Sequence, residues 1–281
     1  FSRGFICPKG STLRQLHDDP DRLRKPLVKR DGKHVEVTWD EAWQEVERGL
    51  MQVINTHGRE AVATYLGNPG AHNLGSMTHN RVALQGIGTK QRFSASSVDQ
   101  APKQMASALM FGTVQSVPIP DLDHTDYLLM LGANPYASNG SLCTAPDFPG
   151  RLEGIQARGG KVVVVDPRRS ETAQKASEWI AIVPNGDALF LASIVNVLVA
   201  EGLVAIPSDL IGHVNGLDIV HTAFGRFTPE AVAEKCGVDA QTIRRIAREL
   251  VGAPTAAVYG RIGTTTTTFG ATTSWLIDVV N

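Results

Sequence analysis

The sequence lacks several features that would each define a class of protein. No apolar run approaches the roughly 20 residues needed to span a bilayer. A formal net charge of −1 gives no electrostatic basis for binding nucleic acid or an anionic membrane surface. The three cysteines, Cys7, Cys143 and Cys236, are too few and too widely spaced for a disulfide framework. We therefore expect a globular protein with no membrane span and no nucleic-acid partner.

The same absences bear on location. Few cysteines make a reducing compartment the default, and no signal peptide is visible, so a cytoplasmic location is expected. The chain opens on Phe1 rather than on methionine, from which we expect an upstream segment to be missing. A periplasmic location therefore stays open.

Short apolar strands alternate with helices along the 281 residues. A helix is expected from Thr38, which can cap it, with Glu41 completing a capping box. Strands of four to six apolar residues separated by helices are typical of βαβ units, in which a parallel sheet has helices on both faces. The sequence therefore predicts an α/β protein built of three-layer αβα lobes.

Polar and glycine-rich loops follow four of the expected strands. They are residues 132–135 (Gly-Ala-Asn-Pro), 166–169 (Asp-Pro-Arg-Arg), 184–187 (Pro-Asn-Gly-Asp) and 261–264 (Arg-Ile-Gly-Thr). In an open parallel sheet, ligands bind in the loops beyond the carboxyl ends of the strands.

The residue types in these loops suit a nucleotide. Glycine lets the backbone approach a phosphate, arginine forks onto a phosphate or stacks on a base, and aspartate accepts hydrogen bonds from a guanine edge or a ribose. Each loop alone is more typical of a surface turn, whereas four in order predict a large nucleotide-like ligand. No Gly-x-Gly-x-x-Gly fingerprint follows a first strand, which argues against NAD.

Seven motifs in one consistent order resemble the molybdopterin oxidoreductase family, which includes dimethyl sulfoxide reductase, formate dehydrogenase and periplasmic nitrate reductase. They are "GFICPKG" (4–10), "TWDEAW" (38–43), "YLGNPGAHN" (65–73), "LGANPYAS" (131–138), "VVDPRRSETA" (164–173), "PNGDALFLA" (184–192) and "GRIGTTTTTFG" (260–270). Each motif is weak by itself, and the ordered set carries the resemblance.

In that family a [4Fe–4S] cluster is held by four cysteines, and the last lies in a Gly-x-x-Cys-x-Lys-Gly stretch. Gly4, Cys7, Lys9 and Gly10 match it. The resemblance implies that Cys7 is a cluster ligand and that Lys9 lies between cluster and pterin, where it assists electron transfer. The alternative for Cys7 is a free thiol on a loop. Because a cluster needs four ligands, we expect a fragment that lacks the first three cluster cysteines and the family's C-terminal domain.

The family's cofactor is molybdenum or tungsten bound by two molybdopterin guanine dinucleotides. The resemblance implies contacts from four groups of residues: Gly132, Asn134, Pro135 and Ser138 beside one dinucleotide; Asp166, Arg168 and Thr172 further along it; Gly186 and Asp187 at the guanine; and Gly67, Asn68, Gly70, Gly263 and Thr264 facing the pterins. We expect the fragment alone to bind this cofactor weakly or not at all.

A protein side chain usually completes the coordination of the metal in this family. The spacing within residues 93–112 places Asp99 at that position, as a catalytic metal ligand. Ser96 and Ser97 are alternatives after a small shift in alignment. Asp99 could instead cap the helix that begins near Pro102. Cys143 is expected to be a small buried core residue.

The resemblance implies three parts to the chain. Residues 1–37 are expected to be a remnant of an iron–sulfur domain, and 38–95 with 254–281 an incomplete discontinuous αβα lobe. Residues 96–253 are expected to form a doubly wound, dinucleotide-binding-like domain inserted in that lobe.

The implied function of the longer protein is two-electron redox chemistry or oxygen-atom transfer. A small molecule or oxyanion would be the substrate, and a redox partner protein would exchange electrons through the [4Fe–4S] cluster. The fragment by itself is expected to be inactive. Two alternatives remain: a structural subunit of the type of the large iron–sulfur subunit of complex I, and a generic nucleotide-binding α/β domain.

Overall fold

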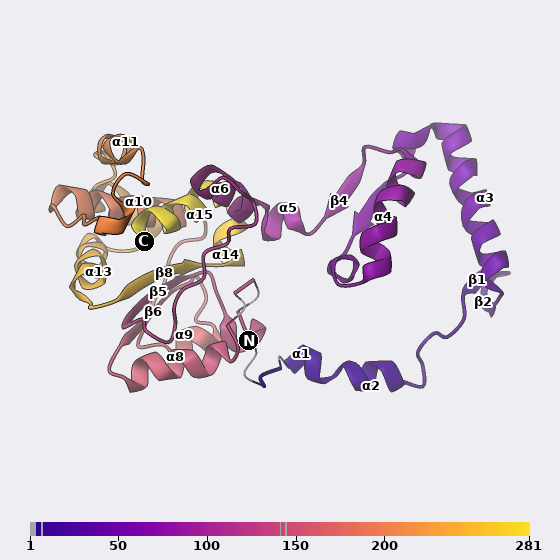
Figure 1. The fold of residues 1–281 in the computed structure, drawn as a ribbon, viewed down its shortest axis with the longest axis horizontal. Helices are drawn as coiled ribbons and strands as arrows, with labels where there is room; N and C mark the ends of the chain where they lie inside the picture. The colour runs from indigo at the N-terminus through magenta and orange to yellow at the C-terminus, as the bar shows by residue number, and fades with distance from the viewer. Residues whose placement is uncertain (1–3, 7, 141, 144) are drawn as a thin grey trace. The chain divides into compact units, whose positions relative to one another are not determined.

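The computed structural model describes residues 4–6, 8–140, 142–143 and 145–281. Two compact units make up the chain, a smaller one of Pro8–Ser97 and a larger one that contains Val98–Asn281 (Figure 1). Among the described residues, none of the helices combines the length with the apolar composition that crossing a bilayer requires.

The smaller unit contains two separate two-stranded sheets, one antiparallel (β1 with β2) and one parallel (β3 with β4). Its longest helix, α3, begins after Thr38, and the reciprocal hydrogen bonds of Thr38 and Glu41 form the predicted capping box. The elements are α1 (Pro8–Ser11), α2 (Leu13–Asp18), β1 (Leu27–Arg30), β2 (Lys33–Glu36), α3 (Trp39–His57), η1 (Arg59–Ala61), β3 (Thr64–Leu66), η2 (Asn68–Ala71), α4 (Leu74–Ile87) and β4 (Arg92–Ser94).

The larger unit is built on one four-stranded sheet in the order β7-β6-β5-β8, with every pair parallel. Its strands are β5 (Tyr127–Leu131), β6 (Lys161–Val165), β7 (Glu178–Ile180) and β8 (Ala256–Gly260). Its helices are α6 (Ala101–Phe111), α7 (Pro135–Ser138), α8 (Phe148–Ala157), α9 (Glu171–Lys175), α10 (Asp187–Ala200), η3 (Ser208–Leu210), α11 (Leu217–Ala223), α12 (Pro229–Cys236), α13 (Ala240–Gly252), α14 (Ile262–Thr265) and α15 (Gly270–Val280), preceded by the short α5 (Ser96–Asp99).

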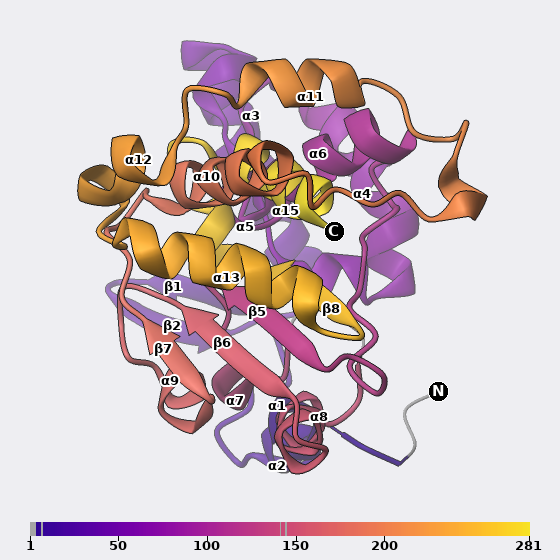
Figure 2. The same ribbon diagram turned by 90° about the vertical axis from the view of Figure 1, so that its left-hand side faces the viewer.

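A separate hydrophobic core lies on each face of this sheet. Leu129 and Leu131 of β5 pack with residues of α10, α12, α13 and α15 on one face. Leu128 and Met130 point the other way and pack with residues of α8 and α9. Figure 2 shows the sheet between these two sets of helices. Because successive side chains of a strand alternate between faces, a strand that is apolar throughout is buried on both sides. The α/β class with a parallel sheet is confirmed.

The position of β8 differs from the expected grouping of residues 254–281 with 38–95. In the structure β8 pairs with β5 along its length, from Tyr127 with Ala256 to Leu131 with Gly260. All five residues of β5 are buried, and an interior strand needs a hydrogen-bonding neighbour on each edge. The chain meets that need by returning to β5 after α13, so residues 256–260 lie in the sheet of the larger unit.

Charged residues close the opposite end of the sheet, where the strands begin. Lys161 at the start of β6 bonds Glu178 of β7 at 2.8 Å and Glu249 of α13 at 2.9 Å. Arg245 also pairs with both carboxylates, and the hydroxyl of Tyr127 donates to Glu249. This network holds α13 across the starts of β5, β6 and β7, and it leaves the carboxyl ends of the strands for a ligand.

A buried ion pair joins α6 to α15. Lys103 Nζ lies 2.8 Å and 3.0 Å from the two carboxylate oxygens of Asp278, and the side chains are 11% and 3% exposed. Burial raises the pKa of Asp278, while the neighbouring ammonium lowers it. The buried charge of Asp278 is tolerated because the Lys103 ammonium is buried beside it as an ion-pair partner.

We predict that Lys103→Met destabilises the protein by about 3 kcal/mol at pH 7, because it leaves the buried Asp278 carboxylate unpaired. The deficit should shrink as the pH falls and Asp278 becomes protonated. Arg248→Met is the matched control, since it removes an ion pair with Glu201 whose side chains are 57% and 30% exposed. Urea unfolding measures both variants, and equal small losses would contradict the prediction.

Candidate cofactor-binding site

The strand order defines where a ligand can enter. From β5 the chain moves outward through β6 to β7, and it then crosses back to place β8 on the other side of β5. The loops after β5 and β8 therefore leave the sheet in opposite directions. In open α/β sheets such a reversal opens a crevice beyond the carboxyl ends of the two strands, where ligands bind. We therefore expect a ligand crevice beside the loops at 132–135 and 261–264.

Two glycines hold the loops after β5 and β8 in contact. The Gly263 N–H donates to the Gly132 carbonyl oxygen at 3.0 Å. A Cβ atom on Gly263 would lie 2.6 Å from the Gly132 Cα atom, and a Cβ on Gly132 would lie 2.7 Å from the Gly263 Cα atom. Gly132 also has a φ angle of +55°, in the left-handed region. The contact thus requires glycine at both positions.

Asn134 joins the loop after β5 to the helix after β6. Its amide nitrogen donates to Glu171 Oε2 at 2.7 Å, and its amide oxygen accepts from both the N–H and the hydroxyl of Thr172. The Ser138 hydroxyl donates to the Asn134 carbonyl oxygen, and Pro135 begins α7. The structure therefore brings together Asn134, Pro135, Ser138 and Thr172, and their contacts with a dinucleotide stay predictions. Glu171 is a further member that the sequence analysis did not identify.

Asp187 supplies a buried carboxylate on the loop side of the sheet. It begins α10 directly after Gly186 and is 5% exposed. Burial raises its pKa to about 6, and the negative charge of Asp166 adds to the rise. Asp166 is itself half-buried, accepts from the Arg168 N–H at 2.8 Å and has a pKa raised by burial. Because burial makes the ionised carboxylate of Asp187 unfavourable, a ligand that donates hydrogen bonds to it would stabilise it.

A third link joins the loops after β7 and β8. Asn185 adopts a left-handed conformation at φ +70°, and its side-chain oxygen accepts from the Thr268 N–H at 3.0 Å. Thr264 lies at the crevice as well, where it is buried and donates its hydroxyl to the Arg261 carbonyl oxygen. Asn185 and Thr268 were not among the predicted residues. An asparagine before a glycine was the available signal, because asparagine tolerates positive φ.

Asp99 also contacts the segment that follows β8. Arg261 Nη2 donates to Asp99 Oδ1 at 3.1 Å, and the Asp99 side chain is 36% exposed. Gln100, not Asp99, occupies the N-cap position of α6, so the helix-cap alternative is wrong. The rival Ser97 donates its hydroxyl to the Ser94 carbonyl oxygen.

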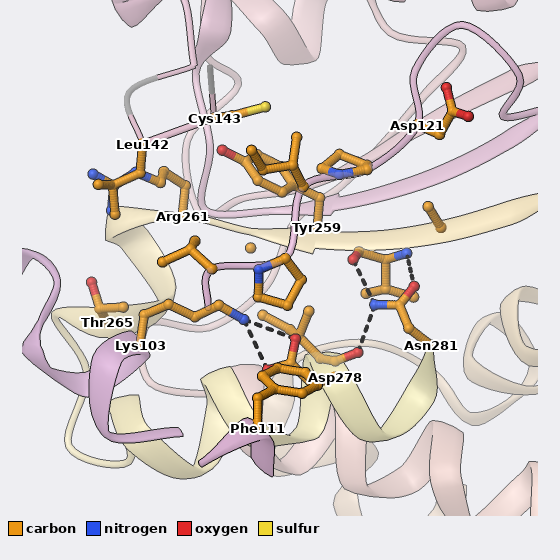
Figure 3. Close-up of a pocket in the computed structure, with 18 residues that line it drawn as sticks. Lys103, Phe111, Asp121, Leu142, Cys143, Tyr259, Arg261, Thr265, Asp278 and Asn281 are labelled. Atoms are coloured by element: carbon orange, nitrogen blue, oxygen red, sulfur yellow. Dashed lines mark hydrogen bonds and ion pairs between the residues drawn. The ribbon is translucent and has the colours of Figure 1, made fainter. Parts of the chain in front are cut away.

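A pocket of about 380 Å³ lies along the open edge of β8. Figure 3 shows Arg261, Tyr259 and Cys143 above the strand ribbon and the pair of Lys103 and Asp278 below it. The Arg261 guanidinium forms part of this wall while it holds Asp99.

The remaining predicted residues lie elsewhere. Lys9 is in α1, and Gly67, Asn68 and Gly70 are in or next to η2, all within the smaller unit. Their proposed contacts stay predictions. Cys7 lies outside the described residues.

The cysteines do not fit an iron–sulfur cluster within this chain. Cys143 and Cys236 are buried free thiols on opposite faces of the sheet, which confirms Cys143 as a core residue. Within the part of the chain that the structure describes, no three His, Cys, Asp or Glu side chains gather as a metal site. A [4Fe–4S] cluster takes four ligands, and residues other than Cys143 and Cys236 would have to provide them.

The fold is that of an α/β protein with a parallel sheet, and comparison with known proteins defines the family. The model of the molybdopterin oxidoreductase family matches residues 22–278. The chain therefore belongs to the molybdopterin oxidoreductase family.

Three curated relatives illustrate the similarity. The chain is 31% identical over 264 residues to the thiosulfate reductase molybdopterin-containing subunit PhsA of Salmonella typhimurium, covering 90% of this chain and 32% of that protein. It is 27% identical over 271 residues to formate dehydrogenase H of Escherichia coli, covering 94% and 37%. It is 28% identical over 269 residues to a nitrate reductase of Symbiobacterium thermophilum, covering 89% and 34%. The chain thus spans 32% to 37% of the length of these relatives.

A solved structure supports the fold. Acetylene hydratase from Pelobacter acetylenicus superposes with a TM-score of 0.74 at 20% sequence identity, covering 98% of this chain and 37% of that one.

We predict that Gly263→Ala destabilises the protein by about 2 kcal/mol, because the new Cβ would press on the Gly132 backbone and separate the two loops. Gly252→Ala is the control, since no atom lies within 4 Å of the Cβ it would add. Chemical denaturation compares the two. If Gly263→Ala is as stable as Gly252→Ala, the loops are not in contact as described.

Asp187→Asn should stabilise the unliganded protein at pH 7. The pKa of Asp187 is raised from 3.8 to about 6, so ionisation above pH 6 costs stability, roughly 3 kcal/mol for about two pKa units. Below pH 4 the carboxyl is protonated in both states and the cost disappears. The stability gain should therefore be full at pH 7 and vanish between pH 6 and pH 4.

Asp218→Asn is the matched control for this test, because Asp218 is also in the first turn of a helix but is exposed. Urea unfolding as a function of pH measures both. If Asp187→Asn is less stable than wild type at pH 7, ionisation of the buried Asp187 carboxyl does not cost stability, and the prediction is wrong.

Proposed function

We propose that the longer protein is a molybdenum or tungsten oxidoreductase whose bis-molybdopterin guanine dinucleotide cofactor lies in part in the crevice between β5 and β8. One observation carries this proposal: a two-glycine backbone contact at the reversal of strand order, with the buried carboxylate of Asp187 beyond it. The two glycines carry no side chain where the loops after β5 and β8 meet, which suits a phosphate-containing chain. The family match supports a pterin-bound metal as the ligand.

Each group of residues has a distinct role in this proposal. Asp187 accepts hydrogen bonds from the guanine N–H groups, and the backbone at Gly186 shapes the turn before it. Asp166 and Arg168 contact the sugar and phosphate further along, where an arginine suits a phosphate. Gly132 and Gly263 let the backbone approach the cofactor closely.

The remaining crevice residues hold the walls. Asn134 and Thr172 are hydrogen-bonded to each other. Together they fix the short helix α7, from Pro135 to Ser138, beside the dinucleotide. Thr264 faces the pterin from the segment after β8.

Asp99 is the proposed protein ligand of the metal, with Ser96 and Ser97 as rivals. When bound, the metal supplies two-electron redox chemistry, and oxygen-atom transfer is one form of it. A carboxylate oxygen is a hard donor that suits a high-valent metal. Asp99 would contribute this carboxylate, to which Arg261 Nη2 donates a hydrogen bond at 3.1 Å.

Residues near the start of the given sequence supply the proposed electron path in the longer protein. Cys7 would be one ligand of a [4Fe–4S] cluster, and Lys9 would lie between cluster and pterin, where a positive charge stabilises added electrons. Gly67, Asn68 and Gly70 would face a pterin. Substrates of the oxyanion or small-molecule type and a redox partner protein belong to the same proposal. The chain of 281 residues alone would be inactive.

Elemental analysis of the full-length protein tests this proposal. We expect about one molybdenum or tungsten and four iron atoms per chain, with loss of activity but not of metal in Asp99→Ala. Asp218→Ala, at an exposed position on α11, is the control. Iron without molybdenum or tungsten would favour the structural, complex-I-like alternative, and neither metal would favour a generic nucleotide-binding domain.

A further inference from the structure

Two hydrogen bonds from the segment that follows β8 hold Asp99 in place. Arg261 Nη2 donates to the Asp99 carboxylate oxygen Oδ1 at 3.1 Å. The Thr265 hydroxyl donates to the Asp99 backbone carbonyl oxygen at 2.7 Å. One bond fixes the main chain and the other fixes the side chain, although 162 positions of sequence separate Asp99 from Arg261.

Arg261 is itself rigidly placed. Its N–H donates to the Leu131 carbonyl oxygen at 3.2 Å, which continues the ladder between β8 and β5. Its own carbonyl oxygen accepts from both the N–H and the hydroxyl of Thr264, each at 2.7 Å. The guanidinium therefore projects from a backbone that the sheet and α14 hold on both sides.

The burial of the pair is asymmetric. The Arg261 side chain is 9% exposed and that of Asp99 is 36% exposed. A guanidinium is planar and holds a carboxylate in a defined orientation, which an ammonium does not. The other cation on this pocket wall, Lys103, already bonds both oxygens of Asp278. Arg261 thus holds Asp99 at the carboxylate oxygen Oδ1, while about a third of the Asp99 side chain stays exposed.

We propose that Arg261 is a positioning residue, which fixes the orientation in which the Asp99 carboxylate would bind the metal. The role toward the metal rests on the proposed function; the hold on Asp99 does not. Thr265 supports the same orientation through the Asp99 backbone.

Carboxyl labelling of the metal-free full-length protein tests the hold on Asp99. A carbodiimide with an amine reagent modifies accessible carboxylates, and mass spectrometry reads each site. Arg261→Met should raise the labelling rate of Asp99 by about fivefold, the factor expected from losing one moderate interaction. Arg261→Lys should give an intermediate rate. Asp278 is the internal control, because its pairing with Lys103 in the same pocket should keep its labelling unchanged.

An unchanged Asp99 rate in Arg261→Met would overturn the proposal. If Asp278 labelling also rises in that variant, the pocket has unfolded, and Arg261→Lys then decides: an Asp99 rate equal to wild type overturns the proposal, and a raised rate with Asp278 unchanged supports it.

Metal-loaded full-length protein tests the orientation toward the metal. Arg261→Met should retain wild-type metal content but change the electron paramagnetic resonance spectrum of the Mo(V) or W(V) state, and it should lower kcat more than it changes KM. Arg261→Lys should restore part of the wild-type spectrum. A wild-type spectrum in Arg261→Met despite faster Asp99 labelling would show a merely structural ion pair and overturn the positioning role. No molybdenum or tungsten in wild type would instead overturn the proposed function, while the labelling result would still decide the hold on Asp99.

Discussion

The contact between Gly132 and Gly263 is the constraint on which the rest of the crevice depends. It forms where the chain, having passed outward through β6 and β7, returns to pair β8 with β5. The two backbones are so close that a Cβ atom on either glycine would lie less than 3 Å from the Cα atom of the other. A movement of one loop therefore disturbs the other. The polar side chains that flank the two glycines are therefore placed by the sheet itself rather than by flexible loops.

Two consequences follow from that contact. The segment after β8 is fixed at Arg261, which carries the hold on Asp99. The loops after β6 and β7 are tied to the same frame, through Asn134 with Thr172 and through Asn185 with Thr268. All four loops form one connected rim, in keeping with the preorganisation that a cofactor site requires.

Local features of this molecule were predictable from the sequence, and long-range pairings were not. The capping box of Thr38 and Glu41, the buried strands and the loops after them depend on neighbouring residues, so their patterns are readable. The pairing of β8 with β5 depends on which edge is free once β6 has docked, and no local pattern encodes that. Likewise, the sequence around Asp99 does not indicate that Arg261 is its partner. The local sequence was also compatible with Asp99 as a helix cap, a position that Gln100 occupies in the structure.

The central claim is that the crevice between β5 and β8 takes a guanine dinucleotide. The most direct test is to denature the purified full-length protein, hydrolyse what it releases and identify the nucleotide by mass spectrometry. The account predicts a guanine nucleotide, about two per molybdenum or tungsten, and its loss in Asp187→Ala. Release of an adenine nucleotide, or of none from a protein that contains the metal, would contradict it.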